Sequence, residues 1–187
     1  MIPARIGSKG TPQKVIRPFN GEPLIFKVIN TALMLKDTLV VVNTDSSKIS
    51  NMIKKKYIDE VDIYNRPPEF GGDEITLDEL ALDFVLNCNI TDAILITLQP
   101  TSPLLSIETL LRLKNEFIDN DCDTLISVTE KRKLEWSKLD DDSFVKKYKE
   151  RVNRQHIEPS FTETGAVVIC NAKTLHAKRS RFGAIVN

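Results

Sequence analysis

Continuous apolar runs alternate with segments of helical periodicity along most of this chain. The runs are short and rich in β-branched residues, which is typical of strands buried on both faces of a parallel sheet. They cover residues 39–42, 92–98, 123–128 and 166–170. Between them, apolar residues recur at three- and four-residue intervals, which predicts amphipathic helices. These helices are expected over residues 24–33, 77–85 and 107–117.

The order of these elements predicts the fold class. Strands that alternate with helices favour an α/β protein, here a three-layer α/β/α sandwich around a mainly parallel sheet. Thr76 or Asp73 is suited to begin the second predicted helix, and Ser106 to cap the third. Asp45, which follows the first of the four runs, is more typical of a helix cap than of a catalyst. Ligands of such sheets bind at the carboxyl ends of the strands.

A charged region, residues 129–161, interrupts this alternation. It contains the basic run 131–133, the acidic run 140–142 and the chain's one tryptophan. The apolar residues of this region have no obvious place in the main core: they are Trp136, Leu139, Phe144, Val145 and Tyr148. We therefore expect one domain over residues 1–187 with an insertion that projects from the sheet. The insertion is either a solvated excursion or a surface that binds a partner.

Composition argues against several classes of function. The 26 basic residues balance 26 acidic ones, so no overall field attracts nucleic acid or an anionic membrane. No apolar run approaches the ~20 residues that span a bilayer, and no signal peptide is visible, so we expect a cytoplasmic protein. Three isolated cysteines predict buried thiols. With two isolated histidines, no set of metal ligands is identifiable within the chain.

The segment 3–14, PARIGSKGTPQK, carries the chemistry that most constrains the function. Gly7 and Gly10 allow a tight turn whose backbone N–H groups can converge on an anion. Three cations surround the same turn: Arg5, Lys9 and Lys14. This set suits a triphosphate, and a solvated basic loop is the alternative. It is not a Walker A loop, because Thr11 and Pro12 follow Gly10 where that motif has Lys and then Ser or Thr.

The same segment resembles the P-A-R-x-x-S-K-G-x-x-x-K-N signature of the cytidylyltransferases that activate nine-carbon acidic sugars. These are the acylneuraminate cytidylyltransferases (CMP-sialic acid synthetases) and their legionaminic and pseudaminic relatives. Val15 departs from the signature, because the family usually has Asn there. The resemblance extends over roughly residues 2–183 through further motifs, and Thr164 replaces the usual Asn in the last of them. These motifs are LQPTSPL at 98–104, Arg66-Pro67 with DEIT at 73–76, Arg154-Gln155, and FTETGA at 161–166.

The resemblance implies a role for each matching residue. Arg5 and Lys14 would be catalytic, because they would stabilise charge on the phosphates. The residues that would bind the nucleotide are Ala4, Gly7, Ser8, Lys9, Gly10, Arg66 and Thr76. The residues that would bind the sugar substrate are Gln99, Thr101, Ser102, Arg154, Gln155 and Phe161. Arg154 suits a sugar carboxylate, which a guanidinium can bind through two hydrogen bonds.

The reaction implied by the resemblance transfers CMP from CTP to the anomeric hydroxyl of a sialic-acid-like nonulosonic acid and releases pyrophosphate. Mg²⁺ is the expected cofactor, because it would shield the phosphates. The resemblance also implies a homodimer that pairs through residues 129–161. The first and last strands are short, and the aspartate pair that holds magnesium in the family is not present, so we expect truncation at both termini.

The sequence leaves alternatives open. A 3-deoxy-manno-octulosonate cytidylyltransferase shares the fold and the chemistry, but it tends to carry S-T-R-L-P-G-K where this chain has Ser8-Lys9-Gly10. A catalytically silent nucleotide-binding homologue is compatible with Val15 and Thr164. A dinucleotide-binding dehydrogenase has little support, because the chain lacks a G-x-G-x-x-G turn.

Overall fold

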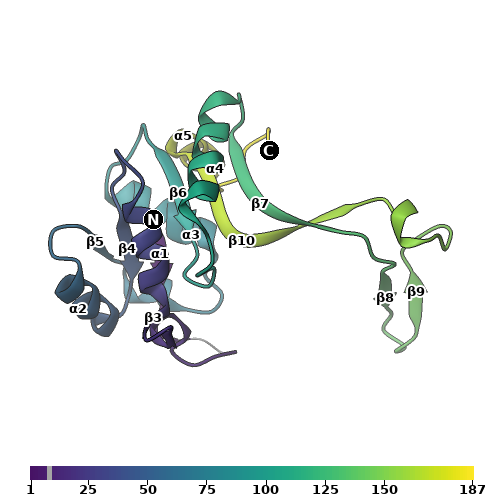
Figure 1. Ribbon diagram of the computed structural model, residues 1–187, viewed down its shortest axis with the longest axis horizontal. Coiled ribbons are helices and arrows are strands. Elements are labelled where there is room, and N and C mark those ends of the chain that lie inside the picture. Colours follow the sequence, from purple (N-terminus) through teal and green to yellow (C-terminus); the bar gives the residue numbers. More distant parts are fainter. Residues whose placement is uncertain (8–9) are drawn as a thin grey trace. The chain divides into compact units, whose positions relative to one another are not determined.

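The computed structural model describes residues 1–7 and 10–187 (Figure 1). The chain forms two compact units. The first unit comprises Met1–Ile126 and Gly165–Asn187, and the second comprises Ser127–Thr164.

The first unit is built on strands that run mainly parallel. β1 (Ile2–Ala4) pairs in parallel with β4 (Val41–Thr44), which pairs in parallel with β5 (Asp62–Asn65). On its other side β1 lies beside β6 (Ile94–Leu98), to which Met1 makes two backbone hydrogen bonds of 2.8 and 3.0 Å. The two bonds reach residues two apart on β6, as parallel neighbours require.

Two longer strands complete the order β6-β10-β7. β10 (Ser160–Asn171) runs antiparallel to β6, and β7 (Thr124–Lys131) follows it. Val186 forms a parallel bridge with Thr124 near the end of the chain. The prediction of a mainly parallel sheet is therefore confirmed, with β10 as an antiparallel member that its apolar run could not distinguish.

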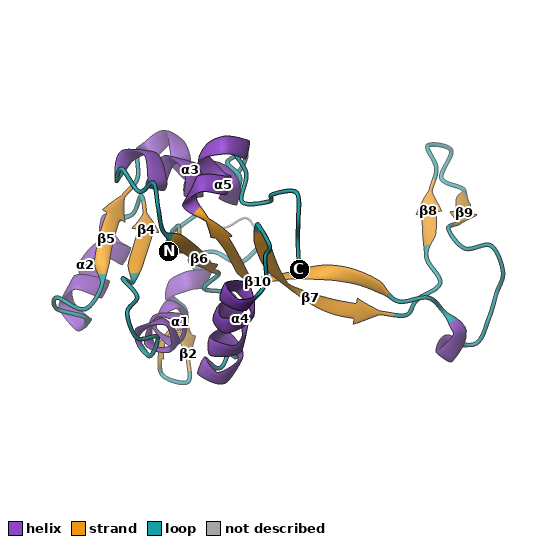
Figure 2. Cartoon of the chain, turned by 90° about the horizontal axis from the view of Figure 1, so that it is seen from above, coloured by secondary structure: helices purple, strands orange, loops and turns teal. Residues whose placement is uncertain are grey.

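Helices cover both faces of this sheet (Figure 2). On one face lie α1 (Leu24–Leu33), α2 (Ser47–Lys56) and α4 (Ile107–Asp119). On the other lie α3 (Leu77–Asn87) and α5 (Ala172–Lys178). The predicted three-layer α/β/α sandwich is thus confirmed.

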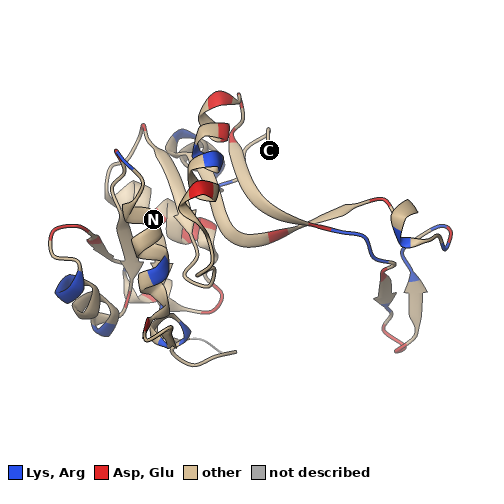
Figure 3. Ribbon diagram, in the orientation of Figure 1, with Lys and Arg blue, Asp and Glu red and all other residues tan. Residues whose placement is uncertain are grey.

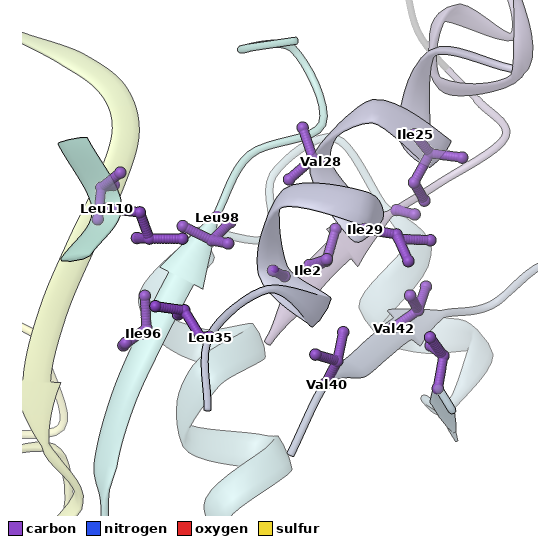
Figure 4. Packing of buried hydrophobic residues seen from close by; sticks show 14 of the residues in the cluster. Ile2, Ile25, Val28, Ile29, Leu35, Val40, Val42, Ile96, Leu98 and Leu110 are labelled. Carbon is purple, nitrogen blue, oxygen red and sulfur yellow. The ribbon is translucent and has the colours of Figure 1, made fainter. Parts of the chain in front are cut away.

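Alternate residues of each strand enter opposite layers, which explains why the strands read as continuous apolar runs. Val40 and Val42 pack with Ile2 and Ile96 in the cluster that contains α1 (Figure 4). Val41, between them, joins the cluster on the face of α3 and α5. A strand with only one buried face would need a polar residue at every second position.

Polar caps begin two of the three predicted helices, whereas α1 follows Pro23 and has no side-chain cap. The Thr76 hydroxyl accepts the Glu79 N–H, and the Glu79 carboxylate accepts the Thr76 N–H, which forms a capping box for α3. The Ser106 hydroxyl accepts the Thr109 N–H at the start of α4. Thr76 is therefore the residue that begins the second predicted helix, and Asp73 is not.

Several elements were not predicted. The helix α2 ends in three lysines and buries few apolar side chains, β5 is short and half-exposed, and α5 has only seven residues. The predicted strand 39–42 begins later than expected, at Val41, and Leu39 is 70% exposed. The remaining short elements are η1 (Lys14–Ile16), β2 (Pro18–Phe19), β3 (Glu22–Pro23) and η2 (Pro68–Gly71).

The second unit contains the predicted insertion 129–161. Its hairpin pairs β8 (Trp136–Lys138) with β9 (Phe144–Lys146) in antiparallel fashion, and η3 (Arg154–His156) follows. The rings of Trp136 and Tyr148 meet edge to face at 5.7 Å. Lys and Arg gather in the segment that leads into β8 (Figure 3).

The cysteines divide into two environments. Cys122 and Cys170 are buried, as predicted, whereas Cys88 is exposed because it follows the last residue of α3. Burial raises the pKa of the Cys170 thiol to about 12, which keeps it protonated and unreactive at neutral pH. Among the residues that the structure describes, no helix has the length and apolarity needed to cross a membrane.

Candidate functional site

A pocket of about 290 Å³ opens where β1, β5 and β6 of the first unit end. Its location agrees with the expectation that ligands bind at the carboxyl ends of parallel strands. The residues that line it come from four separate segments of the chain. Those that the sequence analysis had assigned to a site are Arg5, Gly7, Lys14, Arg66, Gln99 and Thr101.

Arg66 forms the buried floor of the pocket, with a side chain only 1% exposed. Its Nη2 donates to a carboxylate oxygen of Asp45 at 2.8 Å and to the Ala4 carbonyl oxygen at 3.4 Å, and its Nη1 donates to the Asn43 amide oxygen at 3.5 Å. Its Nε is buried and has no hydrogen-bond partner among the described residues. Three of the five N–H donors of this guanidinium are therefore committed to the protein, and the buried Nε is among those left unpaired.

Asp45, which the sequence predicts to be a helix cap, is instead the partner of Arg66. It does not cap α2, because Ser46 does so by accepting the Ile49 N–H. Besides pairing with Arg66, Asp45 lies against Gly71: a Cβ at that position would stand 2.6 Å from the Asp45 carboxylate. Asp45 thus holds the buried arginine and leaves no room for a side chain at Gly71 of η2. No local pattern could have revealed this, because its partners lie more than twenty residues away.

Arg5 lies on the exposed rim of the pocket. Its Nη1 makes an ion pair of 2.7 Å with Asp73 and donates to the Gly72 carbonyl oxygen at 3.2 Å. The two charged side chains are 36% and 34% exposed, so water screens their attraction. This arginine can therefore exchange its partner for an incoming anion at a small cost.

The turn that carries Lys14 is held from two sides. Lys48 of α2 donates to the Gln13 side-chain oxygen at 3.2 Å, and Arg17 donates to the Pro12 carbonyl oxygen, also at 3.2 Å. Gln13 adopts a left-handed conformation (φ 54°), which closes the turn just before η1. Lys14 begins η1 and lines the pocket. The turn therefore presents a cation from a backbone that its neighbours fix.

Val15, the residue that departs from the family signature, lies in an apolar environment. Its side chain is 8% exposed and belongs to the main core, where it also lines the pocket. An apolar residue thus replaces a polar one at a buried position. At Gly7, by contrast, a Cβ would meet none of the described residues within 4 Å, so the described part of the chain leaves space there for a ligand.

Gln99 directly follows β6 and also lines the pocket. The Thr101 hydroxyl donates to its amide oxygen at 3.4 Å, and Gly165 of β10 lies against its amide nitrogen. The backbone N–H of Ser102 closes the turn by donating to the Gln99 carbonyl oxygen at 3.1 Å. Gln99 and Thr101 line the pocket, whereas Ser102 supports the turn behind them.

The other predicted site residues have different surroundings. Ala4 contributes its carbonyl oxygen to Arg66, Gly10 is exposed, and the Thr76 side chain is engaged in the capping box of α3. Ser8 and Lys9 lie outside the described residues. These nucleotide-binding assignments stay predictions.

The second unit holds three residues that are predicted to bind the sugar and are exposed: Arg154, Gln155 and Phe161. Arg154 and Gln155 form part of η3, and Phe161 is near the start of β10. Thr164, which replaces an Asn of the family motif, donates to the Ser127 carbonyl oxygen at 3.1 Å. The assignment of these three residues to the sugar substrate also stays a prediction.

The pocket does not supply ligands for a metal ion. Neither Asp nor Glu is among its described lining residues. Elsewhere in the described part of the chain, no group of three or more His, Cys, Asp or Glu side chains is placed to hold a metal ion. The residues present therefore do not fit the magnesium site that the resemblance implies.

Curated proteins similar to this chain are sugar-acid cytidylyltransferases. The N-acylneuraminate cytidylyltransferase of Streptococcus agalactiae serotype V is 28% identical over 97% of this chain and 45% of its own length. The 3-deoxy-manno-octulosonate cytidylyltransferase of Chlorobium chlorochromatii is 33% identical over 78% of this chain and 56% of its own length. The chain thus spans about half the length of the curated relatives it matches.

Solved structures share the fold. A CMP:2-keto-3-deoxy-manno-octonic acid synthetase complexed with CTP has a TM-score of 0.68 and 17% identity, over 95% of this chain and 75% of that one. A 4-diphosphocytidyl-2C-methyl-D-erythritol synthase has a TM-score of 0.66 and 14% identity, over 95% of this chain and 76% of that one. The family model described as "Cytidylyltransferase" matches residues 1–165, so this chain belongs to the cytidylyltransferase family.

Proposed function

We propose that this protein transfers CMP from CTP to the anomeric hydroxyl of a sialic-acid-like nonulosonic acid, with release of pyrophosphate. The observation that carries this proposal is the convergence of Arg5, Lys14 and Gln99 on one pocket of a cytidylyltransferase chain. The cations suit the phosphates, and the neutral amide suits the hydroxyl or carbonyl oxygens of a sugar.

In this reaction the sugar oxygen attacks the α-phosphorus in line and forms a new phosphorus–oxygen bond. The bond from the α-phosphorus to the bridging oxygen breaks, pyrophosphate leaves with the electron pair, and the hydroxyl proton passes to solvent or to a base. Arg5 and Lys14 would stabilise the charge that develops on the phosphates, and Gln99 would orient the sugar. The chemistry depends mainly on positioning and electrostatics, as in other phosphoryl transfers.

Magnesium is part of the proposal as a counter-ion of CTP rather than as a group held by this pocket. Mg²⁺ commonly keeps several waters and binds through substrate phosphates, with one or two carboxylates. Since the described pocket residues include no carboxylate, no step is assigned to the ion here.

Two observations favour the proposal of a nine-carbon substrate over an eight-carbon one. Ser8-Lys9-Gly10 matches the signature of the acylneuraminate enzymes. Similarity to the N-acylneuraminate relative also extends over 97% of the chain, against 78% for the octulosonate relative.

We also propose a homodimer formed through the second unit. Trp136, Phe144 and Phe161 are each more than half exposed there, and such apolar clusters commonly mark partner surfaces. Two-fold pairing is the commonest way for identical chains to bury such a surface. Light scattering should give a dimer for the wild-type protein and a monomer for Trp136→Ala/Phe144→Ala. A control, Leu104→Ala, removes an even more exposed apolar residue of the first unit and should leave the dimer intact.

The enzymatic proposal is tested by incubating the protein with CTP, N-acetylneuraminic acid and magnesium, and measuring pyrophosphate and CMP-sugar. Replacing CTP with ATP, GTP or UTP should reduce the rate strongly, and 3-deoxy-manno-octulosonic acid should be a poorer substrate. Failure to form any CMP-sugar while CTP still binds would favour the silent nucleotide-binding homologue.

A further inference from the structure

The side chain of Gln99 is enclosed on two sides within the first unit. Its backbone N–H donates to the Ala166 carbonyl oxygen at 3.1 Å, which fixes the start of the side chain beside β10. Its amide oxygen accepts a hydrogen bond from Thr101 at 3.4 Å. Its amide nitrogen lies over Gly165, the residue before Ala166.

Gly165 combines a positive φ with a close neighbour at the position that a Cβ would occupy. Its φ is +70°, a conformation that residues with a Cβ rarely adopt. A Cβ placed there would also stand 3.1 Å from the Gln99 amide nitrogen and 3.6 Å from the amide carbon. A glycine inside a strand often marks a site that another group must approach closely, and here that group is the Gln99 amide.

We propose that Gly165 is a positioning residue that orients Gln99 toward the sugar substrate. This inference rests on the proposed function, because it assigns Gln99 to the acceptor sugar. With the amide oxygen bonded to Thr101, the –NH₂ group, which lies over Gly165, is the part of Gln99 that serves a ligand. Gln99 then acts as a hydrogen-bond donor, and its preferred partner on the sugar is a carbonyl, carboxylate or hydroxyl oxygen.

Gly165→Ala tests this role, and Gly21→Ala is its matched control. Gly21 has φ +83°, so alanine is strained there as well, but a Cβ at Gly21 would meet nothing within 4 Å. Both substitutions should lower the melting temperature by similar amounts. Only Gly165→Ala should raise KM for N-acetylneuraminic acid and lower kcat/KM for it by about ten-fold, since small misplacements of positioning groups are costly. KM for CTP should stay within about two-fold.

A double-mutant cycle separates positioning from a general structural effect. If Gly165 acts through Gln99, then Gly165→Ala should lower kcat/KM in the wild type but add little in a Gln99→Ala background. An equal fall in both backgrounds would overturn the proposal. So would a Gly21→Ala variant with the same loss of kcat/KM as Gly165→Ala.

A spectroscopic readout keeps the inference testable if the wild type forms no CMP-sugar at all. The ¹⁵N-labelled Gln99 side-chain amide is assigned by its loss in Gln99→Ala. Its resonances should shift in Gly165→Ala and stay in place in Gly21→Ala. Unshifted resonances in Gly165→Ala would refute the positioning role, whereas absence of turnover with a clear shift would refute only the proposed function.

Discussion

The floor and the rim of the pocket use the same chemistry, an arginine paired with an aspartate, in opposite environments. On the floor, Arg66 is 1% exposed and binds Asp45, which is 23% exposed, at 2.8 Å, with further bonds to Asn43 and Ala4. On the rim, Arg5 binds Asp73 at 2.7 Å, but both side chains are about one-third exposed. The distances are nearly equal, so burial rather than geometry separates the two pairs.

This difference indicates separate tasks for the two arginines. A buried guanidinium that loses its carboxylate is left uncompensated at low dielectric, so we expect the floor pair to stay intact when a ligand binds. An exposed pair is worth little and is screened by salt, so the rim pair can open when a phosphate arrives. Arg66 is therefore a fixed part of the site, and Arg5 is the exchangeable cation.

The largest expected effect comes from breaking the floor pair. Asp45→Asn should lower the free energy of unfolding by about 3 kcal/mol, because it leaves the buried Arg66 without its counter-charge. Urea denaturation measures this loss. The matched change on the rim, Asp73→Asn, should cost less than about 1 kcal/mol. Equal losses in the two variants would show that burial does not distinguish the pairs.

Lys14→Ala should affect the reaction and leave the fold intact. Loss of a cation that acts on the transition state should lower kcat by about 10²–10³-fold, by analogy with the removal of an oxyanion donor. The free energy of unfolding should change by no more than about 0.5 kcal/mol, as for other surface substitutions. Lys54→Ala removes an exposed lysine of α2 and serves as the control. A normal rate for Lys14→Ala would remove this lysine from the catalytic set.

The sequence predicted Arg66 and residues of the rim, but not the Asp45 partner that holds Arg66 in the floor. Arg5, Gly7 and Lys14 lie within one short motif, so their convergence needed only a local turn. The Arg66–Asp45 pair depends on β4 and β5 lying side by side, because each residue follows one of these strands. A contact between residues 21 positions apart leaves no periodic signal.

The helices and strands that the sequence predicted are likewise those whose packing leaves a periodic apolar pattern. Helices such as α1 and α4 show a strong apolar stripe because they pack across the sheet. The helix α2 buries only Ile49, Ser50 and Ile53, so its sequence reads as a polar segment. Antiparallel pairing of β10 is set by its neighbours, because a doubly buried strand has the same apolar pattern in either direction.

Asp73→Asn should also show, through CTP affinity, that the rim pair can exchange its carboxylate for a phosphate. If the Asp73 carboxylate occupies the place of a phosphate on Arg5, its removal should tighten CTP binding by about two- to five-fold, which corresponds to a surface pair of up to about 1 kcal/mol. Calorimetric titration measures the affinity, and the gain should fade at high salt. Glu74→Gln removes the neighbouring charge as a control. Weaker binding in Asp73→Asn would instead mean that Asp73 holds Arg5 in its working position.

The smallest expected effect concerns the cap of α3, beside the rim. The Thr76 backbone N–H donates to the Glu79 carboxylate, and this bond, followed by one from the Thr76 hydroxyl, lowers the Glu79 pKa below its ordinary value near 4.5. A lowered folded-state pKa means that the ionised cap stabilises the fold above pH 4.5, and that this contribution is lost as the pH falls through the folded-state pKa.

Melting temperatures of the wild type and Glu79→Ala should therefore differ slightly at pH 7 and converge as the pH falls through the lowered folded-state pKa of Glu79. Glu69→Ala removes an exposed carboxylate of η2 as the control and should give no such pH-dependent difference. A wild-type advantage over Glu79→Ala that persisted unchanged below the folded-state pKa of Glu79 would mean that the side chain stabilises α3 by packing or by its neutral form. The capping box would then hold Thr76 independently of pH, and acid would not loosen this side of the rim.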